Sequence, residues 1–102
     1  MCIYAVTVKD HPEKVKIGMS SRWKTRRREY ENWNLADGDG ILEERVFTIT
    51  DEFVDLRALE SHILDRITLN QAARREWFVG SVDDAGRMID RILCEHEISY
   101  LL

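Results

Sequence analysis

Five of the seven residues at positions 22 to 28 are cationic: Arg22, Lys24, Arg26, Arg27 and Arg28. A run of guanidinium and ammonium groups is suited to contact the phosphates of a nucleic acid. A solvated helix face, balanced by acidic residues elsewhere, would have the same composition. The run therefore indicates a phosphate-binding surface but does not establish one.

Hydrolysis of a phosphodiester bond requires a cation near the developing charge, a group that helps to deprotonate water, and an acceptor for a hard metal ion. Arg26 suits the first role because the N–H fork of a guanidinium can hold two phosphate oxygens. Tyr30 follows four residues later, so both side chains would project from one helix face towards the same point. Ordinary amphipathic packing is the alternative explanation for this pair.

Glu60 is a carboxylate beside an apolar helical stripe, a costly place for a charge unless it is paired or binds a metal. The stripe comprises Leu56, Leu59, Ile63 and Ile67. A salt bridge on the helix flank is the alternative, and we favour the metal site. Asn70 or His62 is a further candidate to assist Glu60.

The formal net charge of −4 argues against a generic nucleic-acid coat protein, but the average hides an asymmetry. Residues 1–30 carry eight Lys/Arg and three Asp/Glu, a net charge of +5, whereas residues 31–102 have a net charge of −9. The basic run lies in the positive part, and we expect phosphate contacts there.

A chain of this length fits one domain, residues 1–102, that can bury a core without disulfides or structural metals. No stretch approaches the roughly 20 apolar residues of a membrane span, and no secretory signal pattern opens the chain. Cys2 and Cys94 lie far apart in apolar settings without the spacing of a zinc site. We expect two buried, reduced thiols in a cytoplasmic protein.

The strand-like segments predict a small antiparallel sheet. Residues 2–8 are rich in β-branched residues, and residues 15–19 alternate between apolar and polar side chains. The short connection between the two segments predicts a hairpin. Residues 41–50 form a third strand-like segment, and the residues at 70–75 read as a polar link. Residues 76–79 form a short apolar segment, and we expect Trp77 and Phe78 of this segment, together with Trp33, to be core residues rather than base-stacking platforms.

Three segments with helical periodicity surround these strands. The first is expected to run to about Trp33, the second carries Glu60, and the third is expected to end at about Ile98. The expected N-caps are Ser20 or Ser21 for the first, Thr50 or Asp51 for the second, and Ser81, in a capping box with Asp84, for the third. The predicted fold is α+β: a three-stranded antiparallel sheet flanked by helices, in the order ββαβα plus a C-terminal helix.

Ile3-Tyr4 on the first strand and Lys16-Ile17-Gly18 on the second resemble the two motifs of the GIY-YIG endonuclease superfamily. The spacing also resembles that of the family, because Arg26 lies eight residues after the motif glycine. Tyr30 matches a tyrosine found four residues after that arginine in some members, including nucleotide-excision-repair nucleases. Glu60 falls where the family has its metal-binding glutamate, on the helix after the third strand.

The resemblance covers about residues 3–79 and departs from the commonest pattern at two positions. Cys2 stands where the first motif has Gly, and Lys16 stands where the second has Tyr. A branch of small phage-associated proteins is more similar, because it shares the second motif Val15-Lys16-Ile17-Gly18 and a late Glu76-Trp77-Phe78.

The resemblance implies a metal-dependent endonuclease that acts on DNA. Tyr4 would place its hydroxyl at the attacking water, with Lys16 in an orienting, proton-accepting or electrostatic role. Arg26 and Tyr30 would hold the scissile phosphate, and Glu60 would bind one Mg²⁺ or Mn²⁺. The other cations of the basic run would contact the DNA backbone: Arg22, Lys24, Arg27 and Arg28.

A second hypothesis keeps this scaffold without the cleavage chemistry. The altered motif positions at Cys2 and Lys16 also fit a phage modulator that binds DNA or a host protein through the basic helix. Under either hypothesis the expected location is the cytoplasm, that of the host cell if the gene is carried by a phage.

Overall fold

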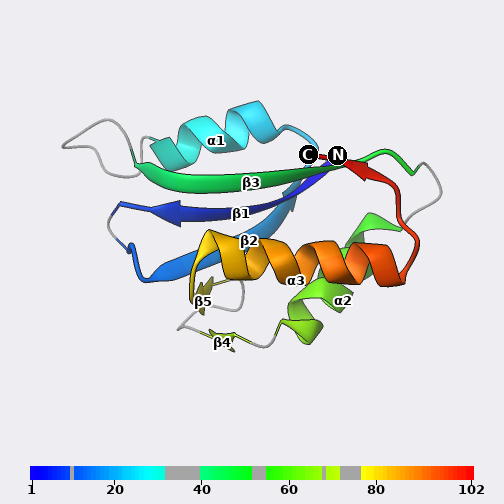
Figure 1. The fold of residues 1–102 in the computed structure, drawn as a ribbon. Helices are drawn as coiled ribbons and strands as arrows, with labels where there is room; N and C mark the ends of the chain where they lie inside the picture. The colour runs from blue at the N-terminus through cyan, green and yellow to red at the C-terminus, as the bar shows by residue number, and fades with distance from the viewer. Residues whose placement is uncertain (10, 32–39, 52–54, 68, 72–76) are drawn as a thin grey trace.

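The computed structural model describes residues 1–9, 11–31, 40–51, 55–67, 69–71 and 77–102. Within these ranges, six strands form one antiparallel sheet in the order β4-β5-β2-β1-β3-β6, and three helices flank it (Figure 1). The α+β fold predicted from the sequence is confirmed.

The centre of the sheet is the predicted hairpin of β1 (Cys2–Val8) and β2 (Lys14–Ser20). Tyr4 pairs with Gly18, and Val6 pairs with Lys16. The third predicted strand, β3 (Ile41–Ile49), pairs with the other edge of β1. All seven residues of β1 are buried, because this strand has neighbours on both edges and helices on both faces.

Three short strands extend the predicted three-stranded sheet. β5 (Trp77–Val79) pairs with the first residues of β2, and β4 (Asn70–Gln71) pairs with β5. On the opposite side, β6 (Tyr100–Leu101) pairs with the end of β3. Segments of two or three residues are too short to show an alternating pattern, so the sequence did not indicate them as strands.

The helices lie on opposite faces of the sheet. α1 (Trp23–Glu31) covers one face, where Trp23 packs against a cluster of Tyr4, Val6 and Val8 (Figure 1). α2 (Leu56–Arg66) and α3 (Val82–Glu95) cover the other face. Their buried residues join alternate residues of β1 in the larger core cluster, which includes Ile3, Ala5, Phe47, Leu59, Ile63, Ile89 and Leu93. Alternation along one central strand therefore supplies two cores.

The predicted starts of two helices need correction. Asp55 caps α2, because its side chain accepts hydrogen bonds from the backbone N–H groups of Arg57 and Ala58 at 3.1 and 3.2 Å. The expected caps Thr50 and Asp51 were wrong, since the helix begins later in the chain. Before α1, the Ser20 hydroxyl accepts a hydrogen bond from the backbone N–H of Arg22 at 3.0 Å. The carbonyl of Arg22 accepts the first helical hydrogen bond, from the N–H of Arg26 at 3.1 Å, so Arg22 is the N-cap position and the expected caps Ser20 and Ser21 were wrong.

The start of α3 is confirmed and its end is not. Ser81 accepts a hydrogen bond from the backbone N–H of Asp84 at 3.1 Å, as predicted. The helix ends at Glu95 rather than near Ile98, because Glu97 has a φ of 55°. The N–H of Ile98 donates to the carbonyl of Leu93 at 3.0 Å, and that of Glu97 to Cys94 at 3.1 Å. This Schellman-type ending satisfies the last carbonyls of the helix and leads the chain back towards β3.

Candidate functional site

Tyr4 and Lys16 lie on the sheet face that α1 covers. Residues that pair directly in an antiparallel sheet point to the same face, and Tyr4 pairs with Gly18. Lys16 lies two residues before Gly18 and pairs with Trp77 of β5 on its other side. The two residues that the sequence selected from the strands are therefore on one surface of the hairpin.

Tyr4 packs directly over Gly18. A Cβ atom at Gly18 would lie 2.6 Å from the Tyr4 hydroxyl oxygen and 2.7 Å from its Cζ. Trp23 covers the ring from α1, with ring centroids 4.5 Å apart and planes tilted by 31°. Tyr4 is consequently 3% exposed, and its position is fixed between a helix and the backbone of β2.

Lys16 is half-buried beside the aromatic residue of β5. Its Nζ lies 5.8 Å from the centroid of the Trp77 ring, within the range of a cation–π contact. Trp77 is 7% exposed and Phe78 is 3% exposed, so both are core residues, as predicted. Trp77 thus supports the Lys16 ammonium group from the side of β5.

Arg26 and Arg27 leave α1 on different sides. The Nε of Arg27 donates to both carboxylate oxygens of Glu44 on β3, at 2.9 and 3.0 Å. Because Trp23 points at Tyr4 on β1 and Arg27 points to β3, Arg26 lies on the flank of α1 that faces β2. Its Nη1 pairs with Glu29 at 3.2 Å, and its side chain is 46% exposed. Arg26 is therefore placed on the side of Lys16, and its exposed ion pair can open.

The remaining cations of the basic run fall into two groups. Arg22, Lys24 and Arg28 are exposed. Arg27 is tied to Glu44 and so has a structural contact besides its predicted contact with DNA. Tyr30 lies on α1 four residues after Arg26, while its side chain and the predicted helix end at Trp33 are outside the described residues.

Glu60 lines a cleft of about 440 Å³ at the end of β2. The other residues of this cleft come from α2, from the chain start and from the end of β2: Leu56, Arg57, Ser61, Met1, Met19, Ser20 and Ser21. Ser20 follows Gly18 by two positions, so it belongs to the Tyr4 face of β2. The cleft therefore begins two residues along β2 from Gly18, the residue on which Tyr4 packs.

The family model of the T5orf172 domain matches residues 1–93. The chain belongs to the T5orf172 domain family. This is a phage-associated family of GIY-YIG-like domains, which agrees with the motifs found at Tyr4 and Lys16 to Gly18. No curated protein and no solved structure matches the chain. Among the described residues of this T5orf172 domain, no helix is both long enough and apolar enough to cross a membrane.

The donor atoms around Glu60 suit a largely hydrated ion rather than a closed metal cage. Across the described part of the T5orf172 domain, no three His, Cys, Asp or Glu side chains gather into a metal-binding group. Glu60 shares its cleft with the hydroxyl-bearing Ser20 and Ser21, which are hard oxygen donors. Mg²⁺ commonly binds proteins through one or two carboxylates and keeps several waters, so these residues fit the predicted ion.

The two further candidates for metal binding have different surroundings. The Nε2 of His62 lies 2.8 Å from the Nε2 of His96 on the neighbouring segment, so its ring is engaged between α2 and the end of α3. Asn70 is in β4, and its side chain is outside the described residues. Of these two, the described side chain, that of His62, is turned to His96.

The cysteines differ from each other, contrary to expectation. Cys2 is buried, and this burial raises the pKa of its thiol. Cys94 is exposed on α3, so the prediction of burial was wrong for this residue. It follows Leu93, which is buried, by one position, and consecutive residues on a helix point in different directions.

Trp23 and Glu44 are positioning residues that sequence reasoning missed. Trp23 covers Tyr4, and Glu44 pairs with Arg27 and thereby links β3 to α1. The signal that could have found Trp23 is the helical spacing of the aromatic residues Trp23 and Tyr30. Glu44 carried no signal, because a contact between β3 and α1 depends on how the two elements pack.

Proposed function

We propose that this T5orf172 domain is a metal-dependent endonuclease that hydrolyses phosphodiester bonds in DNA. The observation that supports it is the shared sheet face of Tyr4 and Lys16 beneath α1, the helix that carries Arg26. The cleft of Glu60 lies at the end of β2, where α2 meets the strand from the other side of the sheet. A base, a phosphate-binding cation and a metal-binding carboxylate are the groups that this reaction needs.

The exposed cations of α1 would bind the DNA backbone, and Arg26 would exchange Glu29 for the scissile phosphate. Its fork of donors would then stabilise the charge that grows on the phosphate oxygens. Tyr30, one turn further along α1, is the proposed second contact to this phosphate. The other backbone contacts would come from Arg22, Lys24 and Arg28, which are exposed, with Arg27 at the edge of the surface.

Tyr4 would orient or deprotonate the attacking water, and Lys16 would assist through its charge. Because Trp23 covers the buried Tyr4 ring and Gly18 beside it is also buried, Trp23 would rotate away to let water and phosphate reach the hydroxyl. Lys16, held over Trp77, would act as a fixed positive charge near the same water. A Mg²⁺ or Mn²⁺ bound by Glu60 would supply charge stabilisation and acidify a bound water.

Incubation of the purified protein with supercoiled plasmid tests this proposal. We expect nicked or linear DNA in the presence of Mg²⁺ or Mn²⁺, none in excess EDTA, and a loss of cleavage in Glu60→Ala. Cleavage that is equal in both proteins would contradict the role of Glu60. No cleavage by either protein across metals and DNA forms would contradict the nuclease activity itself.

A non-cleaving module is the second candidate function, and the surroundings of Tyr4 and Lys16 favour it. Tyr4 is buried under Trp23, and Lys16 takes the place of a motif tyrosine. Such a module would bind DNA, or a host protein, through the exposed cations of α1. Salt-sensitive binding of duplex DNA without cleavage would support a DNA-binding module. A captured host protein, together with no affinity for DNA, would support an interaction protein.

A further inference from the structure

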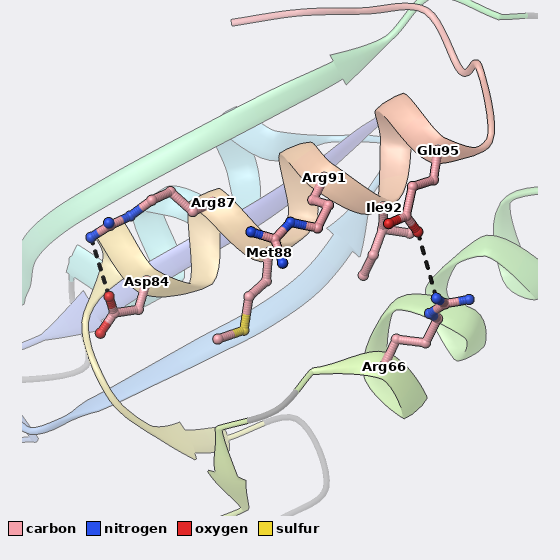
Figure 2. Close-up of a pocket in the computed structure, with 7 residues that line it drawn as sticks. All are labelled: Arg66, Asp84, Arg87, Met88, Arg91, Ile92 and Glu95. Atoms are coloured by element: carbon pink, nitrogen blue, oxygen red, sulfur yellow. Dashed lines mark hydrogen bonds and ion pairs between the residues drawn. The ribbon is translucent and has the colours of Figure 1, made fainter.

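A groove of about 380 Å³ runs between α2 and α3, on the side of the sheet away from α1 (Figure 2). Three arginines from the two helices line it: Arg66, Arg87 and Arg91. Two apolar residues of α3, Met88 and Ile92, and two acids, Asp84 and Glu95, complete the lining. The groove is thus separate from Tyr4, Lys16 and the basic run.

Two of the three arginines are held by weak ion pairs. Arg66 lies 3.5 Å from Glu95, and Arg87 lies 3.3 Å from Asp84. All four side chains are about half exposed or more, and ion pairs with such exposure contribute little to stability. An incoming carboxylate can therefore replace Asp84 or Glu95 at small cost.

Arg91 is the cation of the groove that has no ion-pair or hydrogen-bond partner within the described residues. It lies one helical turn after Arg87 on α3 and is exposed. With two of the arginines compensated by acids, Arg91 gives the groove one uncompensated positive charge. A ligand with negative charge matches this surface.

Apolar side chains lie between the charged pairs. Figure 2 shows Met88 between the Arg87–Asp84 pair and the Arg66–Glu95 pair. Ile92, one turn further on, is 4% exposed and belongs to the core beneath the groove. A phosphodiester backbone has no apolar group to place there, whereas a peptide side chain does.

The charge of the surrounding chain also disfavours DNA at this surface. Residues 31–102 have a net charge of −9, and two acids stand in the groove itself. A long polyanion would meet this repulsion along its whole length. A short peptide brings only a few charges and can pair each of them with an arginine fork.

We propose that this groove binds a segment of a partner protein in which an apolar side chain is flanked by carboxylates. The apolar side chain would contact Met88, and the flanking carboxylates would pair with Arg91 and with Arg66 or Arg87. Its volume is at the lower end of that of ligand pockets, which suits a short segment rather than a folded surface. Because α1 covers the opposite face of the sheet, the bound segment leaves the basic run accessible.

Fluorescence anisotropy with two labelled peptides tests the proposal on the full chain. One peptide carries a central Leu-Phe pair flanked by glutamates, and the other has lysine in place of each glutamate. We expect the glutamate peptide to bind and the lysine peptide to fail. Arg91→Glu should weaken binding by about tenfold or more, as loss of a central charged contact commonly does, and Arg91→Lys should weaken it much less.

Arg28→Glu on α1 is the matched charge reversal outside the groove, and it should leave peptide binding unchanged. Circular dichroism verifies that each variant is folded. Absence of glutamate-peptide binding, equal binding by Arg91→Glu, or binding of both peptides alike would overturn the proposal. It would also be overturned if Arg91→Glu abolished binding of a labelled DNA duplex and Arg28→Glu did not, since the groove would then be a nucleic-acid surface. None of these results depends on DNA cleavage.

Discussion

The hydroxyl oxygen of Tyr4 lies 2.6 Å from the point that a Cβ atom on Gly18 would occupy. Glycine at this motif position therefore makes room for the tyrosine of the facing strand. Trp23 packs on the other side of the Tyr4 ring, with ring centroids 4.5 Å apart. The motif on β1 and the motif on β2 are therefore in direct contact, because the Tyr4 side chain packs on the Gly18 backbone of the paired strand.

We expect Gly18→Ala to destabilise the fold by about 1–3 kcal/mol, because overpacking of a buried site forces side chains off their preferred positions. Urea unfolding followed by circular dichroism measures this change. In the Tyr4→Leu background the same substitution should cost less, since the hydroxyl and Cζ atoms, both within 3 Å of the added Cβ, are gone. The difference between the two backgrounds is the coupling energy of the pair.

Gly86→Ala is the matched control for this series. An added Cβ there meets the side chain of Arg45, which is partly exposed and can move. Alanine is also the better helix former, by up to about 1 kcal/mol. A loss at Gly86 as large as that at Gly18, or equal losses with and without the Tyr4 ring, would show that packing of Tyr4 on Gly18 is not what requires the glycine.

Arg26 and Arg27 are neighbours for which we expect opposite effects. Arg27→Ala removes the two bonds to Glu44 and should lower the free energy of unfolding by about 0.2–1 kcal/mol, since the pair is partly exposed. Cleavage by this variant should fall only a few-fold. Arg26→Ala should leave stability nearly unchanged and reduce the cleavage rate by about 10²–10³-fold, the usual effect of losing a donor to transition-state charge.

The comparison requires single-turnover cleavage rates and urea unfolding curves for both variants. If both variants lose the same amount of activity, the basic run acts only as a general DNA-binding surface. If Arg26→Ala unfolds the protein, its ion pair with Glu29 has a structural importance that its exposure does not indicate.

Alternation and helical spacing were sufficient to predict the central strands and the class of the fold. The β1–β2 hairpin, β3 and the capping serine of α3 appeared where these local patterns indicated them. The start of α2 at Asp55 and the end of α3 before Glu97 were not predicted. Several acids and hydroxyls near residue 50 can cap a helix equally well, and a non-glycine residue with a positive φ leaves no mark in the sequence.

The shared face of Tyr4 and Lys16 also follows from local patterns, because both belong to strands with a readable alternation. The different directions of Arg26 and Arg27 do not, since only the rotation of α1 over the sheet decides which arginine reaches Glu44. The cover of Trp23 over Tyr4 depends on the same rotation. Contacts between elements therefore account for most of what the sequence left open.

The two cysteines should differ in their reaction with iodoacetamide near neutral pH. Burial raises the pKa of Cys2, so less of the reactive thiolate is present, and the closed surface also limits access. Cys94 is exposed and should react first. Mass spectrometry of digested protein measures both rates. Equal rates in the native protein, or faster labelling of Cys2, would contradict the burial of β1.

The role of Glu60 is tested most directly by comparing wild-type protein with Glu60→Gln in two assays on the same end-labelled DNA duplex. The amide keeps the size of the side chain and removes the charge that would hold the metal. We expect duplex binding in EDTA to be unchanged and Mg²⁺- or Mn²⁺-dependent cleavage to be lost in the variant. Cleavage at the wild-type rate by Glu60→Gln, with binding intact, would contradict the proposal that Glu60 holds the catalytic metal ion.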